Sequence, residues 1–177
     1  MEVRLTGYAP GDIGRVVALH ADYYAARWGF GRAFEAKVAQ ELGAYLDGFR
    51  EGADGFWAAR AKGAAEDAAG DAAGGAAGGA LAGSLSIQGR DADATGARLR
   101  FFITDPAYRD RGVGAKLMDA AMAFCDRAGF ARVWLTTFEG LDPARRLYER
   151  HGFRLIETHL GDQWGREVRE QTFERLR

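Results

Sequence analysis

One stretch of the chain decides the fold. It runs from Leu99 to Phe153 and reads LRFFITDPAYRDRGVGAKLMDAAMAFCDRAGFARVWLTTFEGLDPARRLYERHGF. Its apolar residues recur first with the period of a strand and then with the period of a helix, and this alternation is repeated once. The periodicity therefore predicts strand, helix, strand and helix, in that order, over residues 97–104, 113–128, 131–137 and 143–151.

The flanking sequence supplies the remaining elements of a mixed α/β fold. We expect two consecutive amphipathic helices near the N-terminus, over 12–27 and 34–49, with Asp12 as the N-cap of the first. Alternating apolar residues predict further strands, and the segment 89–96 is expected to be a polar turn. The predicted strands begin at residues 3, 56, 81, 153 and 168.

An Ala/Gly-rich segment separates two of these strands. Of the 23 residues from Ala61 to Gly83, 18 are alanine or glycine, with no apolar periodicity. We interpret it as a flexible insertion at about 61–83 that lengthens a surface hairpin, since loop-closure entropy grows slowly with loop length. A linker or a substrate loop is the alternative.

Composition limits the class of protein. A chain of 177 residues with 47% hydrophobic residues is expected to form one domain, 1–177, with a full core. Its 24 Lys+Arg and 25 Asp+Glu give no reason to expect nucleic acid or an anionic membrane as partner. Neither a secretory signal nor a membrane span is predicted, so the expected compartment is the cytoplasm.

Cysteine and histidine usage predicts no metal and no disulfide. The chain contains a single cysteine, Cys125, which falls on the apolar stripe of its predicted helix. We therefore expect a buried, unreactive thiol. The three histidines have neither zinc-like spacing nor an HExxH pattern, so no metal site is expected.

The turn RDRGVGA, residues 109–115, is the first candidate site. The first turn of a helix leaves backbone N–H groups without partners and carries partial positive charge. Gly112 and Gly114 would let a phosphate approach this backbone closely, with Arg109 and Arg111 nearby. Glycine spacing alone favours a phosphate site and a ligand-free turn equally. The turn matches neither a Walker loop nor GxGxxG.

The wider context resembles the GNAT superfamily of Gcn5-related N-acetyltransferases. Arg109-x-x-Gly112-x-Gly114 is similar to the family's pyrophosphate loop, and Thr104-Asp105-Pro106 resembles the V-x-P before that loop. The run Ala144-x-x-Leu147-Tyr148, followed by Gly152-Phe153, resembles the family's A-x-x-L-Y-x-x-x-G-F segment. Residues 8–30 and 165–177 further resemble the GNAT domain found behind MarR-type regulators.

The resemblance implies a fold and a cofactor. It implies a mostly antiparallel central sheet in which a splayed parallel strand pair holds CoA, flanked by about four helices. Acetyl-CoA would be the cosubstrate, its pantetheine arm on the strand and its pyrophosphate on the loop and helix. The cofactor-binding residues implied are Phe102, Ile103, Thr104, Arg109, Arg111, Gly112, Val113, Gly114, Ala115 and Lys116.

The resemblance also implies catalytic and acceptor-binding residues. Tyr148 falls where the family often has a tyrosine near the thioester sulfur, and it would protonate the departing thiolate; a packing tyrosine is the alternative. Glu139 is the candidate general base. Other candidate bases are His20, Tyr24, Glu157 and His159, each more readily explained as structural or solvated. His20, Tyr24 and Trp28 would border the acceptor pocket. Leu141 stands where many members have asparagine.

The function predicted from the sequence is transfer of acetyl from acetyl-CoA to an amine by direct attack in a ternary complex. The acceptor would be a small-molecule or peptide amine, and the protein a monomer or homodimer. The first alternative is an acyl-CoA sensor of the same fold without turnover. The second, a nucleotide- or phosphate-binding α/β domain, is disfavoured because no Walker lysine is present.

Overall fold

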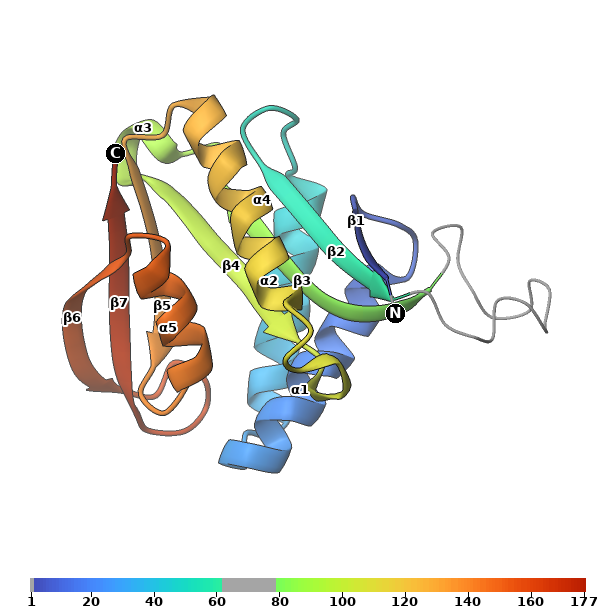
Figure 1. The fold of residues 1–177 in the computed structure, drawn as a ribbon. Helices are drawn as coiled ribbons and strands as arrows, with labels where there is room; N and C mark the ends of the chain where they lie inside the picture. The colour runs from blue at the N-terminus through green and yellow to red at the C-terminus, as the bar shows by residue number, and fades with distance from the viewer. Residues whose placement is uncertain (1, 62–78) are drawn as a thin grey trace.

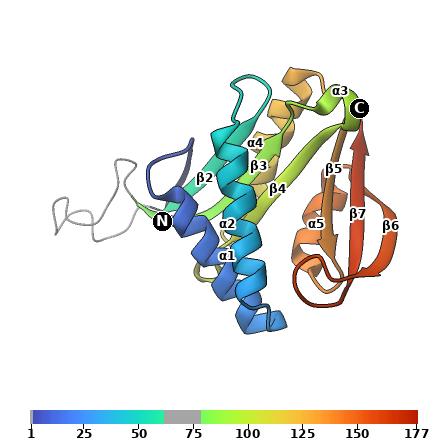
Figure 2. The same cartoon turned by 180° about the vertical axis from the view of Figure 1, so that it is seen from behind.

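The chain folds around one seven-stranded sheet with helices on both faces (Figures 1 and 2). The computed structural model describes residues 2–61 and 79–177. The strands are β1 Val3–Thr6, β2 Gly55–Ala61, β3 Ala80–Gln88, β4 Ala97–Thr104, β5 Arg132–Phe138, β6 Arg154–Gly161 and β7 Val168–Leu176. The helices are α1 Asp12–Trp28, α2 Arg32–Asp47, α3 Ala92–Thr95, α4 Val113–Ala128 and α5 Asp142–Arg150, with a 3₁₀ turn, η1, at Pro106–Tyr108.

The sheet is antiparallel except at its middle. Its strand order is β1-β2-β3-β4-β5-β7-β6, and only β4 and β5 pair in parallel. That pairing comprises Ala97 with Val133 and Arg98 with Trp134, after which the two strands diverge toward their carboxyl ends (Figure 1). The predicted mixed α/β fold with a splayed parallel pair is therefore confirmed, and the divergence creates a slot in the middle of the sheet.

Two apolar clusters fill the two sides of the sheet. Helices α4 and α5 cover one face, where Leu117, Met118 and Cys125 are fully buried against β3, β4 and β5. Helices α1 and α2 cover the other face (Figure 2), where Val16 and Leu42 are fully buried. Each helix thus presents its apolar stripe to the sheet, as the sequence periodicity predicts.

Strand β4 contains a bulge beside the slot. Ser84 of β3 pairs with Ile103, but Ser86 pairs with Arg100, so β4 has one residue more than its partner over this interval. Phe101 takes the positive φ of +50° that accommodates this extra residue. Strict alternation had predicted Phe101 on the same side as Leu99; instead Phe101 packs on the α1/α2 side and Leu99 on the α4 side.

A buried ion pair ties the start of α1 to β2. Arg60 Nη2 donates to both carboxylate oxygens of Asp12, at 2.8 and 2.6 Å, and Arg60 Nε donates to Thr6 Oγ1. Asp12 also accepts the N–H of Ala9, and its side chain is completely buried. The prediction of Asp12 as N-cap is wrong, because Gly11 occupies that position and Asp12 is the first helical residue.

Most predicted elements agree with the structure, with corrections at their edges. The polar turn at 89–96 contains α3, and α5 begins at Asp142, so its N-cap is Leu141 rather than Asp142. Of the predicted insertion at 61–83, residues 62–78 lie outside the described residues, while Ala61 belongs to β2 and residues 80–83 to β3. Across the part of the chain that is described, no helix is long and apolar enough to cross a membrane.

Candidate functional site

The slot between β4 and β5 leads to one cavity on each face of the sheet. The cavity on the α4/α5 face, here called the loop cavity, has a volume of about 390 Å³. The cavity on the α1/α2 face, here called the α2 cavity, has a volume of about 120 Å³. Tyr24, Phe102 and Tyr148 line both cavities. A molecule in either cavity would therefore contact the same three aromatic side chains.

The N-terminus of α4 forms one wall of the loop cavity. Gly112 precedes the helix with φ +72°, and the first amide bonded within the helix is that of Lys116, which donates to the Gly112 carbonyl oxygen at 3.0 Å. The N–H groups of Val113, Gly114 and Ala115 therefore have no intrahelical acceptor, and all three residues line the cavity. Such a helix terminus favours an anionic group such as a phosphate.

The two glycines of this turn serve different purposes. A Cβ on Gly112 would meet nothing within 4 Å, so glycine is required there by the positive φ. A Cβ on Gly114 would lie 2.9 Å from Leu147 Cδ1, so glycine there allows close packing of α4 against α5. Only the first of these positions leaves open space beside the backbone for a ligand.

Basic side chains exceed acidic ones around the loop cavity. Arg109, Arg146 and Arg150 line it, against one acidic lining residue, Asp110, among those the structure describes. The guanidinium of Arg109 lies 5.7 Å from the centre of the Tyr23 ring. The cavity thus combines a helix N-terminus with excess positive charge, and both favour an anionic ligand.

Two of the predicted cofactor residues, Arg111 and Lys116, do not line the loop cavity. Lys116 Nζ instead donates to the carbonyl oxygen of Val3 at 3.3 Å. Gly112 and Arg109 line it together with β4 residues Phe102, Ile103 and Thr104, as do Val113, Gly114 and Ala115. The structure thus gathers eight of the ten predicted cofactor residues around one cavity.

Tyr148 lies where the two cavities meet. It projects from α5, is 5% exposed, and packs against the rings of Phe102, Phe153 and Phe173 with centroid distances of 5.9, 6.1 and 5.9 Å. Burial raises the pKa of the Tyr148 hydroxyl well above its usual value. The phenol is therefore protonated at neutral pH and can donate a hydrogen bond or a proton.

Tyr24 lies opposite, on α1. Burial raises the pKa of Tyr24 as well, and the nearby hydroxyl groups of Tyr148 and Tyr23 raise it further. The Tyr24 ring is in contact with Phe30, Phe34 and Phe138 at centroid distances of 5.8, 5.0 and 5.8 Å. It is a rigid wall of both cavities, whereas the sequence prediction placed it only at the acceptor pocket.

His20 lines the α2 cavity as a neutral imidazole. Its Nδ1 lies 2.8 Å from the Val16 carbonyl oxygen, which can only accept, so Nδ1 carries the proton and Nε2 keeps its lone pair. Burial lowers the pKa of His20 to about 4, and the hydrogen bond to Val16 offsets this only in part. The imidazole is therefore an acceptor, and a weak base, throughout the neutral pH range.

Four charged side chains line the α2 cavity and were not predicted from the sequence: Lys37 and Glu41 of α2, and Arg98 and Arg100 of β4. Glu41 accepts from Lys37 and from Arg100. Burial by itself would raise the pKa of Glu41, but Lys37, Arg100 and, to a smaller extent, Arg98 together outweigh it and lower the pKa. The sequence contained one signal, because arginines alternate with apolar residues in a central strand that has neighbours on both sides.

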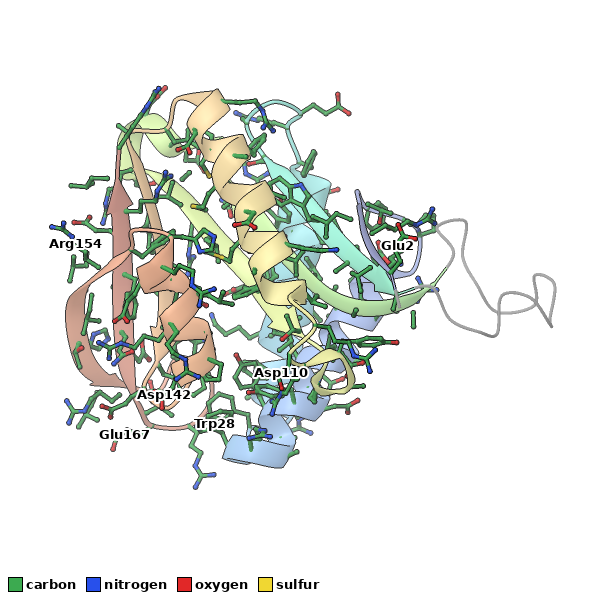
Figure 3. The ribbon with its side chains drawn as sticks, in the orientation of Figure 1. Glu2, Trp28, Asp110, Asp142, Arg154 and Glu167 are labelled. Atoms are coloured by element: carbon green, nitrogen blue, oxygen red, sulfur yellow. The ribbon has the colours of Figure 1, made fainter. Side chains whose placement is uncertain are left out.

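Two predicted site residues lie outside both cavities. Trp28 lies at the end of α1 (Figure 3) and packs against Tyr24 in a tilted contact and against Phe138 edge to face, without lining either cavity. The Glu139 side chain is 66% exposed, its carboxylate 3.6 Å from Arg169 Nε. Because Glu139 lines neither cavity, the mechanism proposed below assigns it no role as the base.

The other residues weighed from the sequence also lie away from the junction. Glu157 and His159 are on the outer strand β6, where both side chains are more than half exposed. Cys125 is fully buried on α4, and burial raises the pKa of its thiol to about 12. Among the described residues no group of three or more His, Cys, Asp or Glu side chains is placed to hold a metal ion.

Comparison with known proteins agrees with this geometry. A sequence model of the acetyltransferase (GNAT) family matches residues 13–153. The fold is similar to that of a GNAT-family acetyltransferase from Staphylococcus aureus Mu50, with 16% identity, 99% of both chains covered and a TM-score of 0.71. It is also similar to a GCN5-related N-acetyltransferase from Kribbella flavida, with 19% identity, 99% and 98% coverage and a TM-score of 0.68.

A third similar solved structure is a chimera that includes a spermidine N-acetyltransferase from Vibrio cholerae. It is 14% identical, with 99% of this chain and 96% of that chain covered and a TM-score of 0.64. A search of curated proteins finds no match. At these identities the solved structures establish the fold alone.

Proposed function

Because the chain belongs to the GNAT family of acetyltransferases, we propose that it transfers an acetyl group from acetyl-CoA to the nitrogen of an amine. One observation carries the proposal. The α4 N-terminal amides that have no intrahelical acceptor open onto a slot made by the divergence of β4 and β5, and Tyr148 lies where the two cavities of this slot meet. The loop cavity would hold the cofactor and the α2 cavity the amine.

The described residues fit CoA at two places. The pyrophosphate would lie on the amides of Val113, Gly114 and Ala115, beside the guanidinium of Arg109. The pantetheine arm would run along β4. The Asp105 N–H donates to Ala82 of β3, so the preceding N–H, that of Thr104, points toward the β5 side, where it can pair with an extended ligand.

The chemistry supplied by bound acetyl-CoA is a thioester carbonyl that accepts a nucleophile. In the reaction the amine nitrogen forms a bond to the acetyl carbon, the carbon–sulfur bond breaks, the amine loses a proton and the thiolate gains one. Tyr148 would donate the proton to sulfur, because its hydroxyl is protonated and lies at the junction. A β4 N–H next to the Phe101 bulge would polarise the carbonyl.

Proton removal from the amine needs no carboxylate in this proposal. The amine would arrive neutral, and the unprotonated Nε2 of His20 would accept a hydrogen bond from it and orient its lone pair. With a pKa of about 4, His20 cannot retain the proton at neutral pH, so the proton passes to water. The rate should therefore rise with pH as more of the acceptor is deprotonated.

The replacement Tyr148→Phe tests the proposal. It removes one hydroxyl and little volume, so packing against Phe102 and Phe173 should survive. We expect kcat for thiol release to fall by about 100-fold, while the Kd of acetyl-CoA measured by calorimetry changes by less than about twofold. Tyr45→Phe is the matched control, because Tyr45 is also buried but bonds to the Gly55 carbonyl away from both cavities; it should lower Tm without lowering kcat.

Two outcomes would contradict the proposal. A Tyr148→Phe enzyme with full kcat would make Tyr148 a packing residue and leave thiolate protonation to water. A wild-type protein that binds acetyl-CoA, yet releases no thiol with any amine between pH 6 and 9, would be an acyl-CoA sensor.

A further inference from the structure

The charges around the α2 cavity do not balance. Lys37, Arg98 and Arg100 are cationic, and the acidic lining residue among those described is Glu41. Glu41 is already shared, because its carboxylate accepts from Lys37 at 2.5 Å and from Arg100. No carboxylate of the described residues lies within 4.0 Å of Arg98.

Two contacts hold the Arg98 side chain in place, but one of its hydrogen-bond donors has no acceptor. Its Nη2 donates to Thr136 Oγ1 at 3.2 Å, and its guanidinium lies 4.8 Å from the centre of the Trp134 ring. Its Nε is buried and has no hydrogen-bond partner among the described residues. A buried donor without an acceptor is costly, and for a charged group the cost is larger.

The buried acidic residue Glu170 of β7 does not line the α2 cavity and has other partners. Its carboxylate accepts from the backbone N–H and the side chain of Gln163, and it lies 3.4 Å from His159 Nε2. Burial lowers the pKa of Arg98, and repulsion from Arg100 lowers it further, while the attraction of Glu41, which lies beyond ion-pair distance, opposes both without outweighing them. The α2 cavity thus presents an unpaired guanidinium.

We propose that the acceptor amine carries a carboxylate on the same small molecule, and that Arg98 binds this carboxylate in the α2 cavity. This inference rests on the proposed function, since it assigns the acceptor to that cavity. Arg98 lines the cavity, and a guanidinium matches a carboxylate with two parallel hydrogen bonds. The cavity volume of about 120 Å³ suits a small molecule, such as an amino acid, rather than a protein surface.

The position of Arg98 in the sheet agrees with such a substrate. Arg98 and Trp134 form the last pair before β4 and β5 diverge, and the Arg98 side chain leans to Thr136, two residues toward the open end of the slot. Along the strand direction its guanidinium is then roughly two residues from Phe102, which at about 3.3 Å per residue is on the order of 7 Å. A carboxylate on Arg98 would place an amine a few bonds away beside Phe102 and Tyr148.

The experiment compares acids with their carboxamides. Glycine, L-alanine, L-methionine, L-phenylalanine and γ-aminobutyrate are each paired with the corresponding carboxamide, which keeps the amine and removes the negative charge. Binding to the CoA-saturated protein is measured by calorimetry, and turnover with acetyl-CoA by thiol release. The α-amine of an amino amide is less basic than that of the acid, so amine reactivity alone would favour the amides.

We expect at least one acid to bind about tenfold or more tightly than its carboxamide, because a charged hydrogen-bonded pair contributes about this much. Arg98→Gln should reduce that preference to less than about threefold while leaving the Kd of acetyl-CoA unchanged. Arg132→Gln is the matched control: Arg132 also lies over the Trp134 ring, at 5.9 Å, but pairs with Glu174 outside the cavity. It should retain the full preference.

The two measurements separate the inference from the proposed function. If neutral amides bind and turn over as well as the acids, the enzyme stands and the carboxylate site is refuted. If an acid binds through Arg98 but no thiol is released, the carboxylate site stands and the acetyltransferase assignment fails. If no acid binds more tightly than its amide, the inference is overturned whatever the turnover.

Discussion

The neutral state of His20 makes the stability of the protein depend on pH in a defined window. In the unfolded chain this imidazole has a pKa of about 6.5, whereas burial in the folded protein lowers it to about 4. Between these values the unfolded state binds a proton at His20 that the folded state does not bind. The free energy of unfolding therefore falls as the pH is lowered from about 6.5 to 4, and is unaffected by His20 above that window.

The size of the effect follows from the same two values. A difference of one pKa unit corresponds to about 1.4 kcal/mol, so at pH 4.5 the wild type should have lost about 2–3 kcal/mol through His20 alone. That is a large share of the roughly 5–15 kcal/mol typical of folded proteins. Carboxylates such as Glu41, whose pKa is lowered, also lose stabilisation in acid, so wild type and variant must be compared at each pH.

The assay is urea unfolding of wild type and His20→Gln from pH 7.5 to pH 4.5, followed by circular dichroism. The side chain of the variant does not titrate, so contributions from all other groups cancel in the difference. As the pH is lowered over this range, the unfolding free energy of the wild type should fall by about 2–3 kcal/mol more than that of the variant. Parallel pH curves for the two proteins would show that His20 is solvated or charged in the fold, and would refute its role as a neutral acceptor.

Three further predictions concern other parts of the molecule. Arg60→Met leaves the buried Asp12 carboxylate with only the partly exposed Arg15, at 3.5 Å, as a cationic partner, and should lower the free energy of unfolding in urea by about 3 kcal/mol; a loss below about 1 kcal/mol would refute this. Gly112→Glu should raise the calorimetric Kd of CoA more than tenfold over Gly112→Gln, which shares the backbone strain; equal values would exclude an anion there. Glu139→Gln should keep kcat for thiol release within about twofold, and a larger fall would restore Glu139 as the base.

The elements of the fold could be predicted because their causes are local. Periods of 2 and 3.6 in the apolar residues, with glycines at helix ends, indicate strands and helices within a residue or two of their observed bounds. The bulge at Phe101 could not be predicted, because it depends on how β4 pairs with β3. The partner of Asp12 could not be predicted either, because Arg60 is 48 residues away and no local pattern joins them.

The residues of the candidate site also fall into two groups, those that local sequence predicts and those that depend on the tertiary structure. The residues of the glycine turn and Tyr148 follow from a motif whose spacing fixes a strand end and two helices, and all but Arg111 and Lys116 line a cavity. Glu139 was assigned from its place just after the predicted strand 131–137, and Trp28 from its place at the end of the first predicted helix. In the structure Glu139 lies near Arg169 and solvent, and Trp28 packs against Tyr24 and Phe138 outside both cavities. The charges of the α2 cavity come from α2 and β4, and only the folded sheet brings these together.

The sheet itself determines how the two substrates meet. The β4–β5 pairing ends at Arg98 and Trp134, and the two strands are separated from that pair toward their carboxyl ends. In the proposed reaction the cofactor enters from the α4 face and the amine from the α2 face, so they can meet only between the separated parts of the strands, at Tyr24, Phe102 and Tyr148. A carboxylate bound to Arg98 would fix how far the acceptor extends along the slot from the Arg98–Trp134 pair. The distance between carboxylate and amine should therefore select among acceptors more strongly than the character of the side chain, which the panel of α-amino acids and γ-aminobutyrate measures directly.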